Sequence, residues 1–305
     1  DQYFGGQGYG PTALSPAERS AGQAPAPGAE AGDIPDWLWP IWCRSLGADA
    51  DAVARALQSR ADVHLRVNLA RVSRDEARLL LEAEGIRTSA HSAATSALIV
   101  EEGARRIRLS KPFQQGLIEL QDAASQAIAE SLDLRAGMRV LDYCAGGGGK
   151  TLAMAAQAEI DIFAHDVNHK RMRDLPDRAA RAGIQVTVAK TDELRDMAPF
   201  DLVLCDAPCS GSGSWRRDPE GKWRLTENRL DDLVKLQTSI LKAAKDFTAA
   251  GGQLAYATCS LLDVENDPQV HDFIKENNAF SLVETMRWSP LRHTDGFFFA
   301  SMTRA

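Results

Sequence analysis

The sequence lacks long apolar runs and a secretion signal. No stretch approaches the roughly 20 apolar residues of a membrane-spanning helix, and the opening residues contain no signal-peptide core. The chain begins at Asp1 rather than at a methionine, which we interpret as the start of a fragment of a longer protein. We predict a cytoplasmic protein without a membrane partner, and we expect a monomer.

Cysteine is scarce, and its spacing indicates neither a disulfide framework nor a zinc site. The five cysteines are an odd number, and no two of them form a Cys-x-x-Cys pair. An odd count without a secretion signal is typical of free thiols in a reducing compartment. Cys205 and Cys209 lack the second pair of ligands that a structural zinc site requires. We therefore expect no metal.

The chain also lacks an excess of basic residues. Its 35 lysines and arginines and 42 acidic residues give a formal net charge of −7, whereas contacts with nucleic-acid phosphates need cations. Basic residues nevertheless cluster within 105–111, 170–173 and 216–224, and Trp215 and Trp223 interleave the last cluster. Charge interleaved with aromatic rings is typical of single-stranded RNA binding. Solvated loop and helix faces are the alternative interpretation.

The remaining composition is that of an ordinary globular protein. With 305 residues, 44% hydrophobic and 25% charged, the chain is long enough for one large and one smaller domain. Residues 1–35 are rich in Gly, Ala and Pro and predict a linker or irregular arm. Residues 36–112 combine helical and short strand patterns, which predicts a small α+β module. In this module we interpret Trp37, Trp39 and Trp42 as core anchors, with base stacking as the alternative.

From residue 113 to residue 305, short apolar strands alternate with helical segments. We expect strands within 139–143, 161–166, 186–189, 202–205 and 254–257. Alternation of this kind predicts a doubly wound, mostly parallel sheet. The predicted fold class is therefore α/β, with a Rossmann-like sheet and a smaller N-terminal module.

A glycine-rich turn follows the first of these strands. It consists of Cys144, Ala145, Gly146, Gly147, Gly148, Gly149 and Lys150. Glycines let the backbone approach a ligand closely, and the start of the next helix offers free N–H groups. Ala145 replaces the first glycine of a P-loop, and Thr151 replaces the third glycine of a dinucleotide fingerprint. The turn therefore predicts a ligand site of another type.

Acidic residues follow three successive strands. Asp166 ends the second strand, Asp192 follows the third, and Asp206 ends the fourth. Carboxyl ends of parallel strands line the crevice in which open α/β sheets bind ligands. We interpret Asp166 as the acceptor of two ribose hydroxyls and Asp192 as a neighbour of adenine. A helix cap or a solvated turn is the alternative for each acid.

Two strands run directly into cysteine motifs. Asp206-Ala207-Pro208-Cys209 follows the strand within 202–205, and Thr258-Cys259-Ser260 follows the strand within 254–257. Parallel strands should deliver both thiols to one edge of the sheet. The other cysteines, among them Cys43 and Cys205, are interpreted as small buried residues.

These segments together resemble the RNA cytosine-5 methyltransferases of the RsmB type. That family carries Asp-Ala-Pro-Cys and Thr-Cys-Ser motifs, and its glycine turn reads Asp-x-Cys-Ala-Ala-Pro-Gly-Gly-Lys. The turn is matched at Asp142, Cys144, Ala145, Gly148, Gly149 and Lys150, and it departs at Gly146 and Gly147, where Ala and Pro are usual. The segment 294–299 is similar to the family's closing Asp-Gly-Phe-Phe segment. The resemblance spans about residues 113–305, and the paired cysteine motifs are its most specific part.

The resemblance implies a class I methyltransferase that uses S-adenosylmethionine. The expected cofactor-binding residues are Cys144, Ala145, Gly146, Gly147, Gly148, Gly149, Lys150, Asp166, Arg171, Asp192 and Asp206. It also implies catalysis on a cytosine that is flipped out of its stack. Cys259 would add to carbon 6 and make carbon 5 nucleophilic, and Cys209 would assist release. Asp206 would hydrogen-bond the base, and Lys150 would hold the geometry and lower a thiol pKa.

The implied partner is RNA, with ribosomal RNA expected first and transfer RNA second. The resemblance implies that the module at 36–112 faces the RNA, and that an upstream helical RNA-binding domain belongs to some relatives. Three alternatives stay open. A DNA cytosine-5 methyltransferase would attack through Cys209, a non-catalytic RNA-binding assembly factor would keep only the fold, and an oxidoreductase would use the sheet for a dinucleotide.

Overall fold

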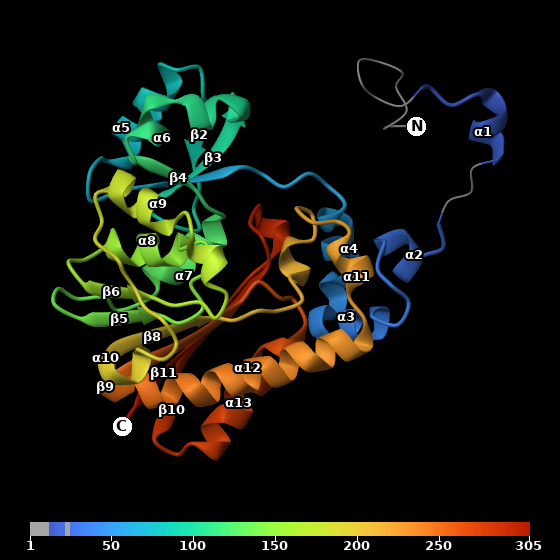
Figure 1. Ribbon diagram of the computed structural model, residues 1–305. Coiled ribbons are helices and arrows are strands. Elements are labelled where there is room, and N and C mark those ends of the chain that lie inside the picture. The colour runs from blue at the N-terminus through green and yellow to red at the C-terminus, as the bar shows by residue number, and fades with distance from the viewer. Residues whose placement is uncertain (1–11, 22–24) are drawn as a thin grey trace.

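The computed structural model describes residues 12–21 and 25–305. It contains a four-stranded sheet formed by strands within residues 64–120 and a seven-stranded sheet formed by strands within residues 139–304 (Figure 1). The fold is thus mixed α/β with a smaller N-terminal sheet, as the sequence predicts. Within the described residues, no helix combines the length and apolar composition that crossing a bilayer requires.

The N-terminal helices are short. They are α1 (Pro16–Ala21), α2 (Ala29–Gly32), α3 (Trp39–Leu46), η1 (Gly47–Asp49) and α4 (Ala50–Leu57). The first two lie in the stretch that the sequence predicts to be a linker or irregular arm. The sequence has a helical pattern over 37–57, but the structure interrupts it, because Gly47 adopts a φ of 55° and ends α3, a conformation that glycine accepts readily.

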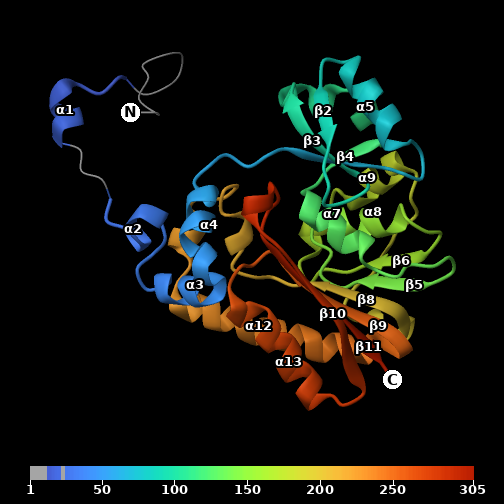
Figure 2. The same cartoon turned by 180° about the vertical axis from the view of Figure 1, so that it is seen from behind.

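The tryptophans of α3 are core residues. Trp42 is fully buried and stacks on Trp215 with 5.8 Å between ring centroids. Trp37 and Trp39 pack against the same cluster, which confirms their interpretation as core anchors. Because Trp215 comes from the C-terminal half of the chain, α3 and α4 pack beside α11 and α12 and not on the small sheet (Figures 1 and 2).

The small sheet has the strand order β2-β3-β1-β4, and all its pairs are antiparallel. Its elements are β1 (His64–Val67), α5 (Arg74–Glu82), β2 (Arg87–Ala90), β3 (Ala97–Glu102), η2 (Ala104–Leu109), α6 (Lys111–Gln114) and β4 (Ile118–Leu120). Ser73 caps α5 by accepting a hydrogen bond from the Glu76 backbone N–H at 3.2 Å. The strand β4 lies beyond residue 112, so the sheet extends past the predicted end of the module.

The large sheet has the strand order β10-β11-β9-β8-β5-β6-β7. Its strands are β5 (Arg139–Asp142), β6 (Asp161–Ala164), β7 (Thr187–Val188), β8 (Phe200–Asp206), β9 (Thr248–Thr258), β10 (Phe280–Trp288) and β11 (Phe297–Arg304). The strands β5 to β9 pair in parallel, whereas β11 runs antiparallel to both β9 and β10. This topology confirms the predicted doubly wound, mostly parallel sheet.

Helices cover both faces of the large sheet because successive strand residues point to opposite faces. On β5, Val140 packs with α7 (Ala123–Glu130) and α8 (Gly149–Ala155), while Leu141 packs with α12 (Glu227–Phe247) and α13 (Asp267–Glu276). The remaining elements are η3 (His169–Met172), α9 (Leu175–Ala182), α10 (Leu194–Met197), η4 (Ser212–Ser214), α11 (Gly221–Arg224), η5 (Asp263–Glu265) and η6 (Pro290–Arg292).

The order of strands along the chain reverses between β5 and β8. From β5 the sheet continues to β6 and β7 on one side, and from β8 to β9 on the other. In open α/β sheets this reversal opens a crevice at the carboxyl ends of the strands. The glycine turn follows β5 and the Asp206–Cys209 segment follows β8, so both predicted motifs lie at this crevice.

Candidate active site

Two cavities open at the carboxyl ends of β5 and β8. The first, here called the Asp166 cavity, measures about 260 Å³ and is lined by Tyr143, Cys144, His165, Asp166, Val167, Arg171, Pro208, Leu236, Ser239, Ile240 and Ala243. The second, the Cys259 cavity, measures about 420 Å³ and is lined by Val63, His64, Leu120, Gln121, Asp122, Ser125, Lys150, Asp206, Arg217, Cys259, Asp295 and Phe297. Asp206, the last residue of β8, lines the second cavity, and Pro208, two residues later, lines the first.

A larger cavity, about 550 Å³, lies away from the predicted site residues. It is lined by Gly137, Asp201 and Gly252, among others, which lie near the amino ends of β5, β8 and β9. Ligands of open α/β sheets bind at the opposite, carboxyl ends of the strands. We therefore place the functional site at the two smaller cavities.

Asp166 supplies the carboxylate that lines the Asp166 cavity. Its Oδ2 accepts hydrogen bonds from the Gly146 backbone N–H at 2.9 Å and from the Arg171 guanidinium at 3.1 Å. Its Oδ1 accepts one from the Asn168 N–H at 2.9 Å. A carboxylate oxygen has two lone pairs, so Oδ1 can accept a further hydrogen bond from a ligand hydroxyl. Arg171, half-exposed, can also turn away.

The glycine turn requires glycine at two positions. Gly146 and Gly148 adopt φ values of 53° and 77°, a region that disfavours other residues. A Cβ on Gly148 would also lie only 2.3 Å from Leu175 Cδ1. The turn is thus closely packed at Gly148. The replacement of the motif's Ala and Pro by Gly146 and Gly147 does not loosen the packing at this position.

Asp142 fastens the end of β5 to the start of α8. Its fully buried Oδ2 accepts a hydrogen bond from Thr151 Oγ1 at 2.6 Å. Burial, only partly opposed by this bond, raises the pKa of Asp142 to about 7. Because Thr151 follows Lys150 on α8, the bond helps to fix the direction in which the Lys150 side chain leaves the helix.

Lys150 and Asp206 form an ion pair on the wall of the Cys259 cavity. Lys150 Nζ lies 2.7 Å from Asp206 Oδ2 and 4.9 Å from the centroid of the Phe297 ring. Lys150 is buried, whereas the Asp206 side chain is 31% exposed. The cation holds this carboxylate in position while leaving part of it open to the cavity.

The two predicted catalytic thiols lie next to each other. Cys209 Sγ and Cys259 Sγ are 3.3 Å apart, which confirms that β8 and β9 bring both cysteines to one edge. Only Cys259 lines the cavity. The hydrogen bond with Cys259, followed by burial, raises the pKa of Cys209 well above its ordinary value. The geometry therefore favours Cys259 as the thiol that meets a ligand.

The other cysteines lie apart from this pair. Cys205 is fully buried in β8, and burial raises its pKa well above the ordinary value. Cys43 packs against the tryptophan cluster of α3, and the pKa of Cys43 is raised, first by burial. Cys144 lines the Asp166 cavity, and burial likewise raises its pKa.

Asp192 lies in the turn after β7. It is exposed and lines neither the Asp166 cavity nor the Cys259 cavity. The short strand β7 ends at Val188, at the edge of the sheet. A side chain several residues beyond an edge strand is free to point toward solvent.

The basic residues of the cluster at 216–224 form ion pairs with acidic residues of the same chain. Arg216 Nε donates to Asp295 Oδ1 at 2.9 Å, and both side chains are buried. Lys222 is buried in another ion pair, and Trp215 belongs to the core cluster described above. The interpretation of these three residues as an RNA-binding surface is wrong, because a buried cation or ring cannot meet phosphates or bases. Residue order alone does not reveal which way a cation points.

Four polar residues that line the Cys259 cavity were not predicted from the sequence: His64, Gln121, Asp122 and Ser125. Asp122 caps α7 by accepting from the Ala124 N–H at 2.9 Å, and its Oδ2 lies 3.1 Å from His64 Nδ1. Burial alone would raise the pKa of Asp122, but the hydrogen bond and charge of His64 outweigh it and lower the pKa. In the sequence, Asp122 can be recognised only as a helix N-cap, and this pattern does not separate a residue that lines a site from an ordinary capping residue.

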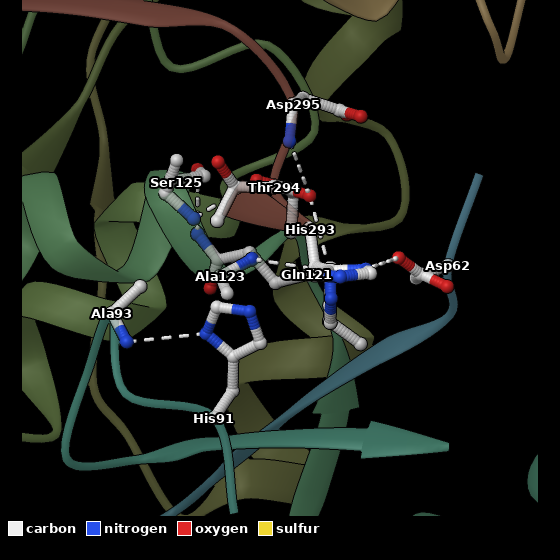
Figure 3. Close-up of polar contacts among 12 residues, drawn as sticks. Asp62, His91, Ala93, Gln121, Ala123, Ser125, His293, Thr294 and Asp295 are labelled. Atoms are coloured by element: carbon white, nitrogen blue, oxygen red, sulfur yellow. Dashed lines mark hydrogen bonds and ion pairs between the residues drawn. The ribbon is translucent and has the colours of Figure 1, made fainter. Parts of the chain in front are cut away.

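Contacts between the N-terminal segment and the closing segment of the chain complete this wall. His293 Nδ1 lies 3.3 Å from Asp62 Oδ2, and the Asp295 backbone N–H donates to Asp122 Oδ2 at 3.1 Å (Figure 3). Arg217 bridges the carboxylates of Asp122 and Asp295, at 3.2 and 2.6 Å. The cavity is therefore built by residues from both ends of the chain.

Two family models match the chain. Residues 129–303 match the model described as 16S rRNA methyltransferase RsmB/F. The chain belongs to the RsmB/F methyltransferase family. Residues 34–106 match the ferredoxin-like domain of RsmF/B-like methyltransferases, which corresponds to the region of the small sheet. Membership in this methyltransferase family supports S-adenosylmethionine as the cofactor.

Among relatives, the ribosomal RNA small subunit methyltransferase B of Citrobacter koseri is 33% identical over 284 residues, covering 88% of this chain and 66% of that protein. The chain thus spans just under two thirds of the length of the curated relatives that it matches.

Solved structures share the fold. The crystal structure of PH0851 superposes with a TM-score of 0.83 at 30% identity, covering 96% of this chain and 69% of that one. NSun6 from Pyrococcus horikoshii, solved with SFG, superposes with a TM-score of 0.79 at 19% identity, covering 88% and 98%. The second likeness shows the fold alone.

The Asp166 cavity fits the adenosine part of such a cofactor. Pro208, Leu236 and Ile240 supply apolar walls of the kind that a planar base packs against. Asp166 has acceptor capacity left for a ribose hydroxyl, as described above. The residues present therefore fit S-adenosylmethionine in this cavity.

Proposed function

We propose that this RsmB/F-family chain transfers a methyl group from S-adenosylmethionine to carbon 5 of a cytosine in RNA. The single observation that carries the proposal is the position of Cys259. Its thiol lines a cavity together with Lys150 and Asp206, and Cys209 lies directly behind it at 3.3 Å between the two sulfurs. A pair of thiols of which one faces the cavity suits a reaction that needs both attack and release.

The cofactor would lie in the Asp166 cavity, beside the glycine turn. Asp166 would accept a hydrogen bond from ribose, and the N–H groups at the start of α8 would face the polar end. When bound, S-adenosylmethionine supplies an electrophilic methyl group. The cofactor roles of Arg171 and of the turn residues stay part of this proposal. Asp192 does not line the cavity, and its place beside adenine stays a prediction.

The target cytosine would enter the Cys259 cavity after flipping out of its stack. The Cys259 thiolate adds to carbon 6, and the electron pair of the ring double bond makes carbon 5 nucleophilic. The Asp206 carboxylate accepts hydrogen bonds from the exocyclic amine and from the protonated ring nitrogen of the adduct, and so stabilises the adduct. Lys150 holds this carboxylate in place through the ion pair.

Release needs the opposite electron flow. After methylation, a solvent water takes the proton from carbon 5, the electron pair of that C–H bond re-forms the ring double bond, and the bond from carbon 6 to Cys259 breaks with its electron pair on the sulfur. Cys209 stands 3.3 Å from the leaving sulfur, at a distance suited to assisting this step. Cys209 lines neither cavity, so it does not compete for carbon 6.

A trapping experiment with RNA that contains 5-fluorocytidine tests the assignment, because fluorine at carbon 5 blocks release. We expect wild type and Cys209→Ser to form a covalent protein–RNA adduct and Cys259→Ser to form none. Cys43→Ser, which changes a cysteine outside the site, serves as the control. A crosslink that maps to Cys209 would refute the assignment and favour the order of attack used by DNA cytosine-5 methyltransferases.

Ribosomal RNA is the first substrate to test, because the relatives named above are ribosomal RNA methyltransferases. Transfer of tritium from labelled S-adenosylmethionine to small-subunit ribosomal RNA is the expected result. Transfer to transfer RNA alone would move the substrate to the second choice. Cofactor and RNA binding without transfer would point to a non-catalytic assembly factor.

The proposed units are an arm at 1–35, an RNA-facing module at 36–112 and a catalytic domain at 113–305; within this division, α3 and α4 pack on the catalytic domain, and the small sheet of the module extends to Leu120. Val63 and His64 of the module line the Cys259 cavity, which supports its position next to the RNA. The monomeric state and the cytoplasmic location stay predictions.

A further inference from the structure

Glu265 is a fully buried carboxylate in η5. Among the residues that the structure describes, no lysine, arginine or histidine forms an ion pair with it. Burying an ionised group is costly unless hydrogen bonds replace the water that it loses. The partners of Glu265 therefore indicate what this carboxylate does.

Four donors converge on Glu265, and three of them come from residues that follow the two site cysteines. Ser210 donates its backbone N–H to Oε1 at 2.8 Å and its hydroxyl to Oε2 at 2.5 Å. The Ser260 hydroxyl also donates to Oε2. Ser210 follows Cys209 and Ser260 follows Cys259, so a single carboxylate joins the two loops.

The fourth donor extends the connection to α12. Gln237 Nε2 donates to Glu265 Oε1 and to the Pro208 carbonyl, both at 2.9 Å. Pro208 immediately precedes Cys209. The Cys209 loop is thus held on both sides of the thiol, by Gln237 before it and by Glu265 after it.

Asn266 holds the Cys259 loop in the same way. Its Oδ1 accepts from Thr258 Oγ1 at 2.6 Å, and its Nδ2 donates to the Ser260 carbonyl at 3.0 Å. Thr258 and Ser260 flank Cys259, and Asn266 is fully buried. Two adjacent buried residues, Glu265 and Asn266, therefore fasten both cysteine loops.

We infer that Glu265, assisted by Asn266, is a positioning residue that sets the distance between the Cys209 and Cys259 sulfurs. It lines neither cavity, so it acts through the two loops and not by contact with a ligand. The catalytic consequence rests on the function proposed above: correct spacing lets Cys209 assist release, whereas loosened spacing leaves the Cys259 adduct in place. The spacing itself is a property of the protein alone.

Substitutions at Glu265 should have graded effects. Glu265→Gln keeps one carbonyl oxygen for the two N–H donors, and the two serine hydroxyls can reverse to accept from its amide. Glu265→Ala removes all four bonds and leaves the N–H groups of Ser210 and Gln237 unpaired. Glu276→Ala is the matched control, because it removes an exposed glutamate of the neighbouring helix α13.

The spacing is measured without substrate by oxidising the folded protein with diamide. Each of Cys209 and Cys259 gives up one hydrogen, diamide takes up both, and the disulfide is counted by mass spectrometry of the linked peptides. The rate is divided by the alkylation rate of Cys259. We expect this ratio to fall about tenfold in Glu265→Ala, as the loss of one to two net hydrogen bonds implies, and to stay within about threefold of wild type in Glu265→Gln. Glu276→Ala should match wild type.

An unchanged ratio in Glu265→Ala would overturn the inference. Should that variant not fold by circular dichroism, Ser210→Ala, which removes one donor, replaces it: a lower ratio supports the inference, and an unchanged ratio overturns it.

Activity then separates this inference from the proposed function. With ordinary cytidine RNA, Glu265→Ala should accumulate covalent adduct and lose kcat with little change in KM. If wild type transfers no methyl group, the proposed function fails, while the diamide ratio still decides whether Glu265 positions the thiols.

Discussion

Replacement of Asp142 by asparagine should change how the stability of the protein depends on pH. Asp142 is fully buried at the end of β5, and its pKa is raised from 3.8 to about 7. Between these two values the folded protein binds a proton that the unfolded chain has released. Stability therefore falls as pH rises through this window and becomes constant above it.

The magnitude follows from the two pKa values. The difference between 3.8 and about 7 corresponds to about 4 kcal/mol at 1.36 kcal/mol per pH unit. More than a third of this cost is already present at about pH 5, so about 2–3 kcal/mol should appear between about pH 5 and about pH 8. Asparagine keeps an oxygen for Thr151 and has no proton to lose, so the variant escapes this loss.

Urea denaturation of wild type and Asp142→Asn at both pH values measures the effect. The stability of Asp142→Asn relative to wild type should rise by about 2–3 kcal/mol from about pH 5 to about pH 8. Asp177→Asn, on the exposed face of α9, controls for the loss of a surface carboxylate. A stability difference between wild type and Asp142→Asn that is the same at both pH values would refute the reasoning.

Three further perturbations test the packing around the site. Gly148→Ala should destabilise the protein by about 1–3 kcal/mol and weaken cofactor binding by calorimetry, because φ is 77° and the new Cβ meets Leu175; unchanged binding would contradict this. Trp42→Ala should cost about 3–5 kcal/mol in urea denaturation, since the ring is fully buried; a loss below about 1 kcal/mol would mean that the site collapses. Asp295→Ala should cost about 3–5 kcal/mol, because it leaves buried Arg216 unpaired, and a thermal shift equal to that of a surface variant would refute it.

The main strands and both cysteine motifs could be predicted because each is encoded locally. The strands β5 and β8 each contain a short apolar run, Val140-Leu141 and Leu202–Cys205, and each is followed by a turn that contains glycine or proline. The strand β10 was not predicted, because most of its residues are exposed at the sheet edge and it lacks an apolar run. The helical pattern over 37–57 did not reveal the break at Gly47, since a positive φ leaves no mark on apolar spacing.

The site was predictable where its residues belong to motifs, as with Lys150, Asp206 and the two cysteines. It was not predictable for His64 or Glu265. Each reaches the site only because segments distant in sequence pack together. No local pattern distinguishes such a residue from an ordinary strand or turn position.

The sequence by itself determined the doubly wound sheet, the glycine turn and the delivery of Cys209 and Cys259 to one edge, because strand period and turn chemistry act over a few residues. Only the tertiary structure decided which thiol faces the cavity and that Arg216 turns inward to Asp295. Both depend on packing between segments far apart in the chain, where burial, charge pairing and available space are settled together.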